Sequence, residues 1–428
     1  MSKVCVIGGG AAGLMAAYAA AKNGNEVVLI EKNEKLGKKI YITGKGRCNF
    51  TNNVPPDEFL TNVVRGEKFL RGTIYAFSPE KVIDFFEEYG LSVKTERGNR
   101  VFPLSDHASD VTKTLEKACK NSGVDVHLRE KVVEIAVNSM PDIGIMSDID
   151  NSRISAVNSV PRVIGVKTDL AYYPCDYAIV ATGGLSYPTT GSTGDGYTFA
   201  KEAGHTVSEL KAGLCGVNLQ GDFFKDLQGL ALKNVALTVK NGSKMVYNAF
   251  GEMLFTHFGV SGPIVLSMSS LINRLPIASL EISLDLKPAL NEETLDRRIL
   301  RDFEENKNKQ IKSVLVQLLP AKLIPYVLKV ANIAETKPVN AITKEERGAL
   351  LRAVKALPLR ARSLRGFEEA IITSGGVSLP EINPKTMESK RVSGLKFCGE
   401  VLDVDAFTGG FNMQIAFSTG FAAGDTIR

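Results

Sequence analysis

The stretch from Val4 to Glu31 constrains the fold of this 428-residue chain more than any other. It reads as a short apolar strand, a glycine turn, an alanine-rich helix and a second strand that ends in an acid. Gly8, Gly10 and Gly13 have the spacing G-x-G-x-x-G, in which the glycines allow a tight turn, a close approach to a pyrophosphate and close helix packing. The sequence therefore predicts a dinucleotide site in a Rossmann-type βαβ unit, with Glu31 accepting hydrogen bonds from a ribose.

Two other interpretations of this stretch are weaker. Residues 4–21 carry no charge and are flanked by Lys3 and Lys22, as in a signal peptide or a membrane helix. The glycines would interrupt such a helix at its centre. A βαβ unit without a ligand would need neither three glycines nor the terminal acid.

Composition narrows the class of protein. Apolar residues make up 44% of the chain and charged residues 23%, and the net charge of +5 is spread over short clusters, which suits anionic small molecules as readily as nucleic acid. The six cysteines form no C-x-x-C pair, and none of the four histidines has metal-ligand spacing with another. We expect a cytoplasmic protein with no metal site, no redox dithiol and no membrane segment.

A glycine- and lysine-rich loop is expected from Lys35 to Asn53. It is longer than most connections and rich in hydrogen-bond donors, so it is predicted to wrap the cofactor rather than to be only a solvated basic loop. Cys48 in this loop has no nearby histidine or second cysteine in the sequence, which favours a pocket-lining residue over a catalytic thiol. Further on, Val132 lies in an expected strand and is predicted either to meet an adenine ring or to be a core residue.

The next informative segment runs from Ala178 to Tyr197. An apolar strand ends in Thr182-Gly183-Gly184, where small residues let the backbone pass close to a cofactor. The glycines that follow do not match G-x-G-x-x-G, so no second canonical nucleotide motif is present.

From about residue 206 the pattern changes to short strands with Gly and Asn turns, and then to helices between about 292 and 357. His257 in this region is interpreted as structural rather than as a catalytic base. Arg360, Arg362 and Arg365 alternate along a strand edge, for which a solvated face is favoured over an anion site.

After the glycine turn, the C-terminal segment gives the strongest indication of a cofactor site. An expected strand ends at Cys398, and Glu400 follows it directly. Gly409-Gly410 precede an expected helix over residues 412–423. The N-terminus of that helix can stabilise the negative charge of a reduced isoalloxazine ring. Together with the N-terminal motif, it favours FAD over NAD, although such a helix can also be merely structural.

These segments resemble the FAD domain of the glutathione-reductase type. The whole chain resembles the bacterial flavoprotein family that includes the BaiN-type bile-acid pathway reductases and the aminoacetone oxidases. The resemblance is carried by the Gly8–Gly13 turn with Glu31 and by residues 44–52, 181–197, 256–263 and 399–416. It implies an α/β fold in which a Rossmann-like FAD-binding domain is interrupted by a β-barrel-like insert domain with a small helical subdomain. The polar stretch at 138–161 departs from the family pattern.

The expected domains are an FAD-binding domain (1–204 and 380–428), a β-rich insert (205–285), a helical subdomain (286–356) and the return strands of the insert (357–379). The predicted FAD-binding residues lie in the glycine turn, after the second strand, in the loop, at the strand exit and near the C-terminus: Gly8, Gly10, Ala11, Ala12, Gly13, Glu31, Lys32, Lys39, Thr43, Gly44, Arg47, Cys48, Asn49, Val132, Ala181, Thr182, Gly183, Gly184, Gly399, Glu400, Gly410, Asn412, Met413 and Gln414. Arg47, Tyr187 and Glu400 are the candidates for the substrate pocket, and no catalytic residue is assigned.

The expected function is that of an FAD-dependent oxidoreductase that moves hydride through flavin N5. Because no second canonical nucleotide motif is present, NAD(P)H is expected to dock transiently over the flavin as the reductant. From the family resemblance, the expected reaction is reduction of an activated C=C bond in a small organic substrate. Two alternatives remain: an amine oxidase that uses oxygen, and a flavoprotein that acts on tRNA. A nucleic-acid partner is otherwise not expected, and the sequence makes no prediction about the oligomeric state.

Overall fold

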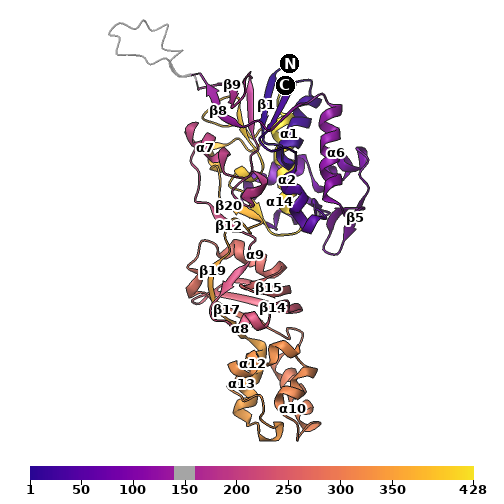
Figure 1. The fold of residues 1–428 in the computed structure, drawn as a ribbon, viewed down its shortest axis with the longest axis vertical. Helices are drawn as coiled ribbons and strands as arrows, with labels where there is room; N and C mark the ends of the chain where they lie inside the picture. Colours follow the sequence, from indigo (N-terminus) through magenta and orange to yellow (C-terminus); the bar gives the residue numbers. More distant parts are fainter. Residues whose placement is uncertain (139–159) are drawn as a thin grey trace, which may run out of the picture. The chain divides into compact units, whose positions relative to one another are not determined.

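The computed structural model describes residues 1–138 and 160–428, which form two compact units (Figure 1). Unit 1 comprises residues 1–211 and 371–428, and unit 2 comprises residues 212–370. The chain therefore leaves unit 1, builds unit 2 and returns, which confirms the predicted class of a Rossmann-like domain with an insert. The expected polar stretch at 138–161 falls almost entirely outside the described residues.

A parallel five-stranded sheet forms the centre of unit 1, in the order β21-β11-β1-β2-β7. In that order the strands are Leu395–Phe397, Tyr177–Val180, Lys3–Ile7, Glu26–Glu31 and Asp125–Leu128. All but the edge strand β7 are largely buried, which explains their nearly continuous apolar sequences. The order places strands from both ends of the chain in one sheet.

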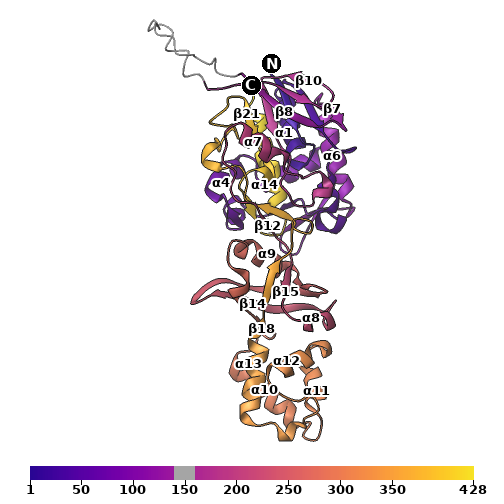
Figure 2. The ribbon, with the colours of Figure 1, turned by 60° about the vertical axis from the view of Figure 1, so that its left-hand side comes forward.

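Helix α1 (Ala11–Lys22) packs along α14 (Phe411–Asp425), and small residues make this contact possible. A Cβ atom on Gly420 would lie 2.3 Å from the carbonyl oxygen of Ala12, so the two backbones meet directly there. The chain ends lie side by side in Figures 1 and 2. Asn25 Nδ2, near the start of the chain, donates to the carbonyl of Ile427 at 3.1 Å. The alanine and glycine content of both helices follows from this close approach.

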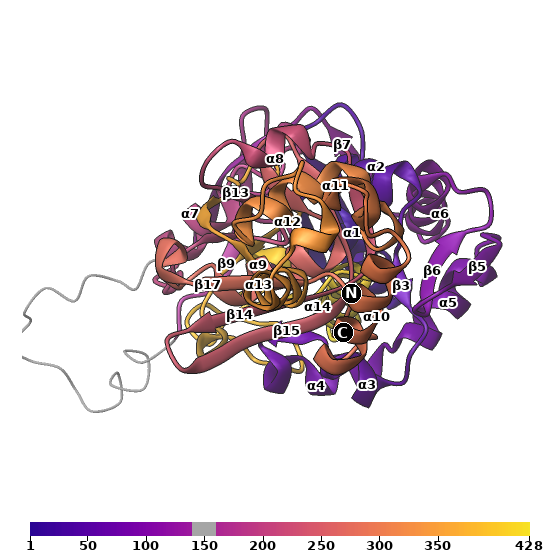
Figure 3. The ribbon, with the colours of Figure 1, turned by 90° about the horizontal axis from the view of Figure 1, so that it is seen from below.

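Smaller elements surround this core. β8, β9 and β10 form an antiparallel sheet, β3 pairs with β6 and β6 with β5, and β4 pairs with β22. Helices α5 and α6 lie with β5 and β6 on one side of unit 1 (Figures 1 and 3). The strands are Thr51–Asn52 (β3), Val63–Arg65 (β4), Val93–Glu96 (β5), Arg100–Pro103 (β6), Val132–Val137 (β8), Val163–Thr168 (β9), Tyr172–Pro174 (β10), Lys211–Gly213 (β12), Ile372–Ser374 (β20) and Asp405–Ala406 (β22). The helices are Lys38–Ile42 (α2), Pro56–Leu60 (α3), Glu67–Ala76 (α4), Pro79–Glu88 (α5), Ala108–Asn121 (α6) and Asp195–Glu202 (α7).

The segment from Lys35 to Asn53 differs from the expected plain loop. It contains helix α2, a 3-10 turn over Thr43–Gly46 and the short strand β3. Ile40 is buried and anchors α2 to the core, a tertiary contact that loop composition does not reveal.

Unit 2 contains an antiparallel seven-stranded sheet in the order β18-β17-β14-β15-β16-β13-β19. The two edge strands are consecutive in sequence and are joined through Arg360, so the sheet must curl until its edges approach each other. No ladder between β18 and β19 closes it among the described residues, and it is barrel-like without being a closed barrel. The strands are Val217–Leu219 (β13), Ala231–Asn241 (β14), Lys244–Thr256 (β15), Gly259–Ser261 (β16), Glu281–Asp285 (β17), Leu357–Leu359 (β18) and Ala361–Leu364 (β19).

The helices of unit 2 depart from the predicted pattern in two places. Helices α8 and α9 lie in the segment 205–285, which was expected to be β-rich. Within the stretch from about 292 to 357, where helices were expected, α11 ends at Val314 and a 3-10 turn over Leu315–Gln317 follows. Pro320 disfavours the helical conformation of Leu319 only, so it bounds this helical stretch but does not account for the end of α11 at Val314. The helices are Phe223–Asp226 (α8), Pro263–Ile272 (α9), Glu292–Glu304 (α10), Ile311–Val314 (α11), Ile324–Val330 (α12) and Lys344–Lys355 (α13). One hydrophobic core includes residues of both the sheet and the helices, and the predicted boundary at 285 stays a prediction.

Candidate functional site

The turn between β1 and α1 is built on glycines with different steric roles. Gly8 has φ +104°, and a Cβ there would lie 2.7 Å from the carbonyl oxygen of Ala181. A Cβ on Gly13 would lie 1.8 Å from the carbonyl oxygen of Gly8, so this glycine is required by packing. Gly10 differs, because a Cβ there would meet no atom within 4 Å. The space beside Gly10 is therefore open at the N-terminus of α1, as the approach of a pyrophosphate requires.

Glu31 organises the end of β2 next to this turn. Its Oε2 accepts a hydrogen bond from the backbone N–H of Gly9 at 2.7 Å. Its Oε1 accepts from the backbone and the side-chain amide of Asn33, at 2.8 and 2.7 Å. The carboxylate is only 9% exposed and is held rigidly, with acceptor capacity left for a ribose hydroxyl. The bond to Gly9 was not predicted from the sequence.

One pocket in unit 1 gathers most of the predicted FAD-binding residues. Those that line it are Gly8, Gly10, Ala11, Ala12, Glu31, Lys32, Lys39, Val132, Ala181, Thr182, Gly183, Glu400, Asn412 and Met413. Those that do not are Gly13, Gly44, Arg47, Cys48, Asn49, Gly184, Gly399, Gly410 and Gln414, and the side chain of Thr43 lies outside what the structure describes. Tyr187, a candidate for the substrate pocket, does not line this pocket. The sequence missed several lining residues, including Gly9, Asn33, Lys38, Lys131, Ser192 and Asp195.

The chain just after β11, which lines the pocket, contains a buried polar group without a hydrogen-bond partner among the described residues. Thr182 Oγ1 is buried and has no hydrogen-bond partner among the described residues. Gly183 beside it has φ +72°, a conformation that favours glycine. A buried hydroxyl without a partner is costly, and a bound cofactor would satisfy it.

The N-terminus of α14 also faces this pocket, since Asn412 and Met413 line it. Gly410 precedes the helix with φ +95°, and a Cβ there would lie 2.3 Å from the carbonyl oxygen of Thr51. No side chain caps the helix. The side chain of Asn412 bonds instead to the backbone of Ala406, at 2.9 Å through Oδ1 and 2.7 Å through Nδ2. Two uncapped helix N-termini, those of α1 and α14, therefore adjoin one pocket.

A polar network fixes another part of the pocket wall. Glu400 Oε2 accepts from Lys39 Nζ at 2.6 Å, and Oε1 accepts from Ser186 Oγ at 2.7 Å and from the Thr373 backbone at 2.8 Å. Lys39 Nζ also donates to Ser186 Oγ at 2.6 Å. The side chains of Lys39 and Glu400 are both about one fifth exposed, so their ion pair is only partly screened by water.

A second ion pair lies on the Glu31 side of the pocket. Lys32 Nζ lies 2.5 Å from Asp195 Oδ2 and donates to Thr193 Oγ1 at 2.5 Å. Asn33 Nδ2 donates to the Thr190 carbonyl at 3.1 Å. The segment after Gly184 thus folds against the end of β2.

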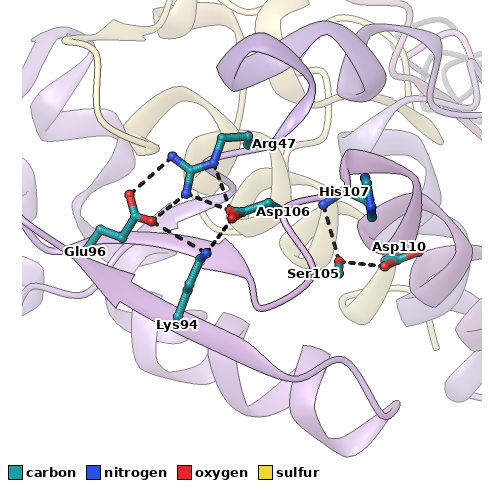
Figure 4. A network of polar contacts seen from close by, with 7 residues as sticks. All are labelled: Arg47, Lys94, Glu96, Ser105, Asp106, His107 and Asp110. Carbon is teal, nitrogen blue, oxygen red and sulfur yellow. Dashed lines mark hydrogen bonds and ion pairs between the residues drawn. The ribbon is translucent and has the colours of Figure 1, made fainter.

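Arg47 lies in a charged network outside the pocket lining (Figure 4). Its guanidinium pairs with Glu96 at 2.5 Å and Asp106 at 2.6 Å, and it stacks over the Phe102 ring at 4.3 Å. Lys94 Nζ also lies 2.6 Å from Asp106. These hydrogen bonds raise the pKa of Arg47 and lower the pKa values of Glu96 and Asp106. The prediction that Arg47 contacts FAD or substrate stays untested.

The cysteines offer little nucleophilic chemistry at this site. Cys398 lines the pocket, but burial raises the pKa of its thiol to about 12, so it is protonated at neutral pH. Cys48 is fully buried, with φ +58°. Within residues 1–138 and 160–428, no three His, Cys, Asp or Glu side chains converge as a metal site would require. No helix in the described part of the chain has the length and apolar character needed to cross a membrane.

The parallel sheet, the glycine turn and the pocket define a dinucleotide-binding protein of the Rossmann class. The model of the HI0933-like protein Rossmann domain family matches residues 2–426, and the chain belongs to this family. It is 29% identical over 430 residues to the 3-dehydro-bile acid delta(4,6)-reductase of Clostridium scindens, covering 99% of this chain and 98% of that one. It is 32% identical over 424 residues to the ribosomal RNA dihydrouridine synthase of Haemophilus influenzae, covering 98% and 97%.

The fold is shared with solved flavoenzymes. The 3-ketosteroid delta1-dehydrogenase of Sterolibacterium denitrificans superposes with a TM-score of 0.54 at 13% identity, over 99% of both chains. The protein is an FAD-dependent oxidoreductase, which confirms the predicted class of enzyme and the prediction of FAD, while NAD(P)H as the reductant stays a prediction. The resemblance to the BaiN-type reductase family is likewise confirmed.

Proposed function

We propose that this enzyme reduces an activated C=C bond, one conjugated to a carbonyl group, in an organic substrate with NAD(P)H as the electron donor. The observation that carries the proposal is the pocket flanked by two uncapped helix N-termini, at Gly10 and Gly410. Both named relatives support the reaction class. A delta(4,6)-reductase by its name saturates ring double bonds, and dihydrouridine is uridine with its ring double bond reduced.

The proposed roles of the chain follow from the geometry. The amides at the start of α1 bind the pyrophosphate, Glu31 binds the ribose and the start of α14 faces the ring system. A helix N-terminus stabilises nearby negative charge by about 0.3–2 kcal/mol, which favours a reduced, anionic ring. Bound FAD supplies hydride transfer through N5. The Lys39–Glu400 pair holds α2 against the Glu400 segment and so keeps the pocket wall in place.

The electron donor is proposed to dock only transiently. The G-x-G-x-x-G spacing occurs once, and the pocket it forms is assigned to FAD. In the net reaction one hydride from NAD(P)H and one proton add across the double bond, and NAD(P)⁺ leaves. The proposed compartment is the cytoplasm, where NAD(P)H is available.

A uridine base in ribosomal RNA is the second substrate candidate, beside a small organic molecule. The specific observation is the division of charge: unit 2 has 22 Lys and Arg against 16 Asp and Glu, a net charge of +6. Unit 1 has 30 against 31, a net charge of −1. A basic unit suits a polyanionic substrate. This candidate replaces the tRNA alternative, because the relative's name specifies ribosomal RNA.

The test uses the purified, FAD-loaded protein under anaerobic conditions. Stopped-flow mixing with NADH or NADPH should bleach the flavin absorbance. A conjugated steroid dienone and a uridine-containing ribosomal RNA should then be compared as oxidants, with the products identified by mass spectrometry. Bleaching by an amine alone, with reoxidation by oxygen, would instead support an amine oxidase. A protein that binds no FAD would overturn the proposal.

A further inference from the structure

A groove on unit 2 combines positive charge, amide groups and an aromatic ring. Its volume is about 650 Å³, within the roughly 300–1,000 Å³ typical of ligand sites. The residues used in the argument are Asn218, Gln220, Asp222, Lys225, Phe258 and Arg362. We call this surface the Arg362 groove.

Two arginines have no acidic partner among the described residues: Arg362, which lines the Arg362 groove, and Arg360, which lies two residues earlier in the chain and outside the lining. Arg360 and Arg362 flank the first residue of β19 and are exposed, and neither forms an ion pair with a residue that the structure describes. Other arginines of unit 2 form ion pairs, for example Arg298 with Asp302 at 3.0 Å and Arg347 with Asp296 at 2.8 Å. An unpaired guanidinium presents its planar set of donors to solvent, which suits bidentate binding of a phosphate.

Aromatic rings accompany these charges. Phe258 lines the groove, and the guanidinium of Arg365 lies over its ring at 4.6 Å. Nearby, Phe223 and Tyr326 are stacked at 3.8 Å with an interplanar angle of 3°, and both are half-buried. Tyr326 OH donates to the carbonyl of Pro358, two residues before Arg360, which places this pair beside the arginines. Rings interleaved with cations are the usual platform for stacking bases of single-stranded nucleic acid.

Acidic residues reduce the charge here without reversing it. Asp222 pairs with Lys225 at 2.6 Å, Glu369 pairs with the Arg365 that lies over Phe258, and Asp226 is exposed at the end of the short helix α8. Arg360 and Arg362 remain unneutralised by described residues. Asn218 and Gln220 use their side-chain amides to hold β19 in register, donating to Ser363 Oγ at 2.9 Å and to the Ala361 carbonyl at 3.1 Å. The arginines therefore project from a rigid strand, which lowers the entropic cost of binding.

We propose that the Arg362 groove binds a single-stranded segment of RNA, with Arg362 on one phosphate, Arg360 beside the groove on the next phosphate, and a base against Phe258. The inference rests on the ribosomal RNA form of the proposed function and adds a docking surface distinct from the FAD pocket. It also replaces the earlier preference for a merely solvated strand edge.

The test measures RNA binding by the full-length, FAD-loaded protein. A fluorescein-labelled 12-nucleotide uridine-rich RNA is titrated by anisotropy at several salt concentrations. The double variant Arg360→Glu/Arg362→Glu should bind at least tenfold more weakly, and its salt slope should fall by about 1.4, since each lost phosphate contact on a single strand removes about 0.7. Phe258→Ala should weaken binding about tenfold and leave the salt slope unchanged, because stacking releases no counterions.

Arg297→Glu/Arg352→Glu is the matched control, since both residues are exposed on helices of the same unit and the net charge changes equally. It should alter binding less than twofold. Flavin absorbance and the NAD(P)H bleaching rate should be unchanged in every variant, which excludes misfolding. An equal loss in the control, or no RNA binding by the wild type, overturns the inference even if a dienone is reduced. RNA bound in the groove without dihydrouridine formation leaves the inference standing and refutes the RNA form of the function.

Discussion

The glycine turn before α1 and the segment around Arg47 look alike in the sequence, since both are glycine-rich and both were predicted to contact FAD. In the turn, Gly8 and Gly13 are required by backbone contacts, while Gly10 leaves open space. In the other segment the main donor, Arg47, is already bound to Glu96 and Asp106. The difference shows that open space beside the backbone marks a ligand site, whereas a donor in a polar loop can be bound by acids from elsewhere in the chain.

The largest effect is expected from Gly13→Ala. A methyl group 1.8 Å from the Gly8 carbonyl oxygen forces the backbone of α1 away from β1. The free energy of unfolding of the apoprotein should fall by about 3 kcal/mol, measured by urea denaturation. Gly72→Ala in α4, where a Cβ meets nothing within 4 Å, should instead be neutral or slightly stabilising. Equal stability of the two variants would refute the steric role of Gly13.

Gly10→Val should lower the affinity for FAD without lowering the stability of the apoprotein. Its side chain would occupy the open space where the pyrophosphate approaches, so FAD affinity should fall at least a hundredfold, about 2.7 kcal/mol. The thermal midpoint of the apoprotein should stay close to that of the wild type. Fluorescence titration with FAD provides the affinity, and Gly72→Val serves as the control for a new valine. Tight FAD binding by Gly10→Val would show that the turn does not hold the cofactor.

Substitutions in the hydrogen-bond network around Glu400 are expected to lower FAD affinity less than Gly10→Val does. Glu400→Gln puts a donor where Lys39, Ser186 and the Thr373 amide all donate, so the pocket wall should loosen and FAD affinity should fall about tenfold. Lys39→Met should act similarly. A double-mutant cycle should give a coupling energy of about 1–2 kcal/mol, because the two side chains share one interaction. Additive losses would mean that the ion pair does not support the pocket.

The smallest effect is expected from Arg47→Met, because the guanidinium is committed to an exposed network (Figure 4). FAD affinity should change less than twofold. The lowered pKa values of Glu96 and Asp106 mean that their contribution to stability is present above pH 4–5 and is lost as the pH falls further. Thermal melts between pH 7 and pH 3.5 should therefore show a shallower acid loss for Arg47→Met. A loss of FAD affinity as large as that of Glu400→Gln would break the comparison and support the predicted cofactor contact.

The sequence was most informative where the physical cause is local. Gly8, Gly10 and Gly13 act within six residues of one another, so their spacing alone predicts the turn. The capping box of Thr343 and Glu346, which starts α13, is equally local. Pairs such as Lys39 and Glu400, 361 residues apart, have no signature in the spacing.

By itself the sequence determined the Rossmann class, the presence of an insert and the type of cofactor, because hydrophobic periodicity and glycine sterics operate over short stretches of chain. Only the tertiary structure decided that Arg47 is held by Glu96 and Asp106, that Glu31 holds the backbone of Gly9, and that α14 meets α1 through Gly420. Each of these contacts joins residues that are distant in the chain, and which partner a charged or small side chain meets depends on how the whole core packs.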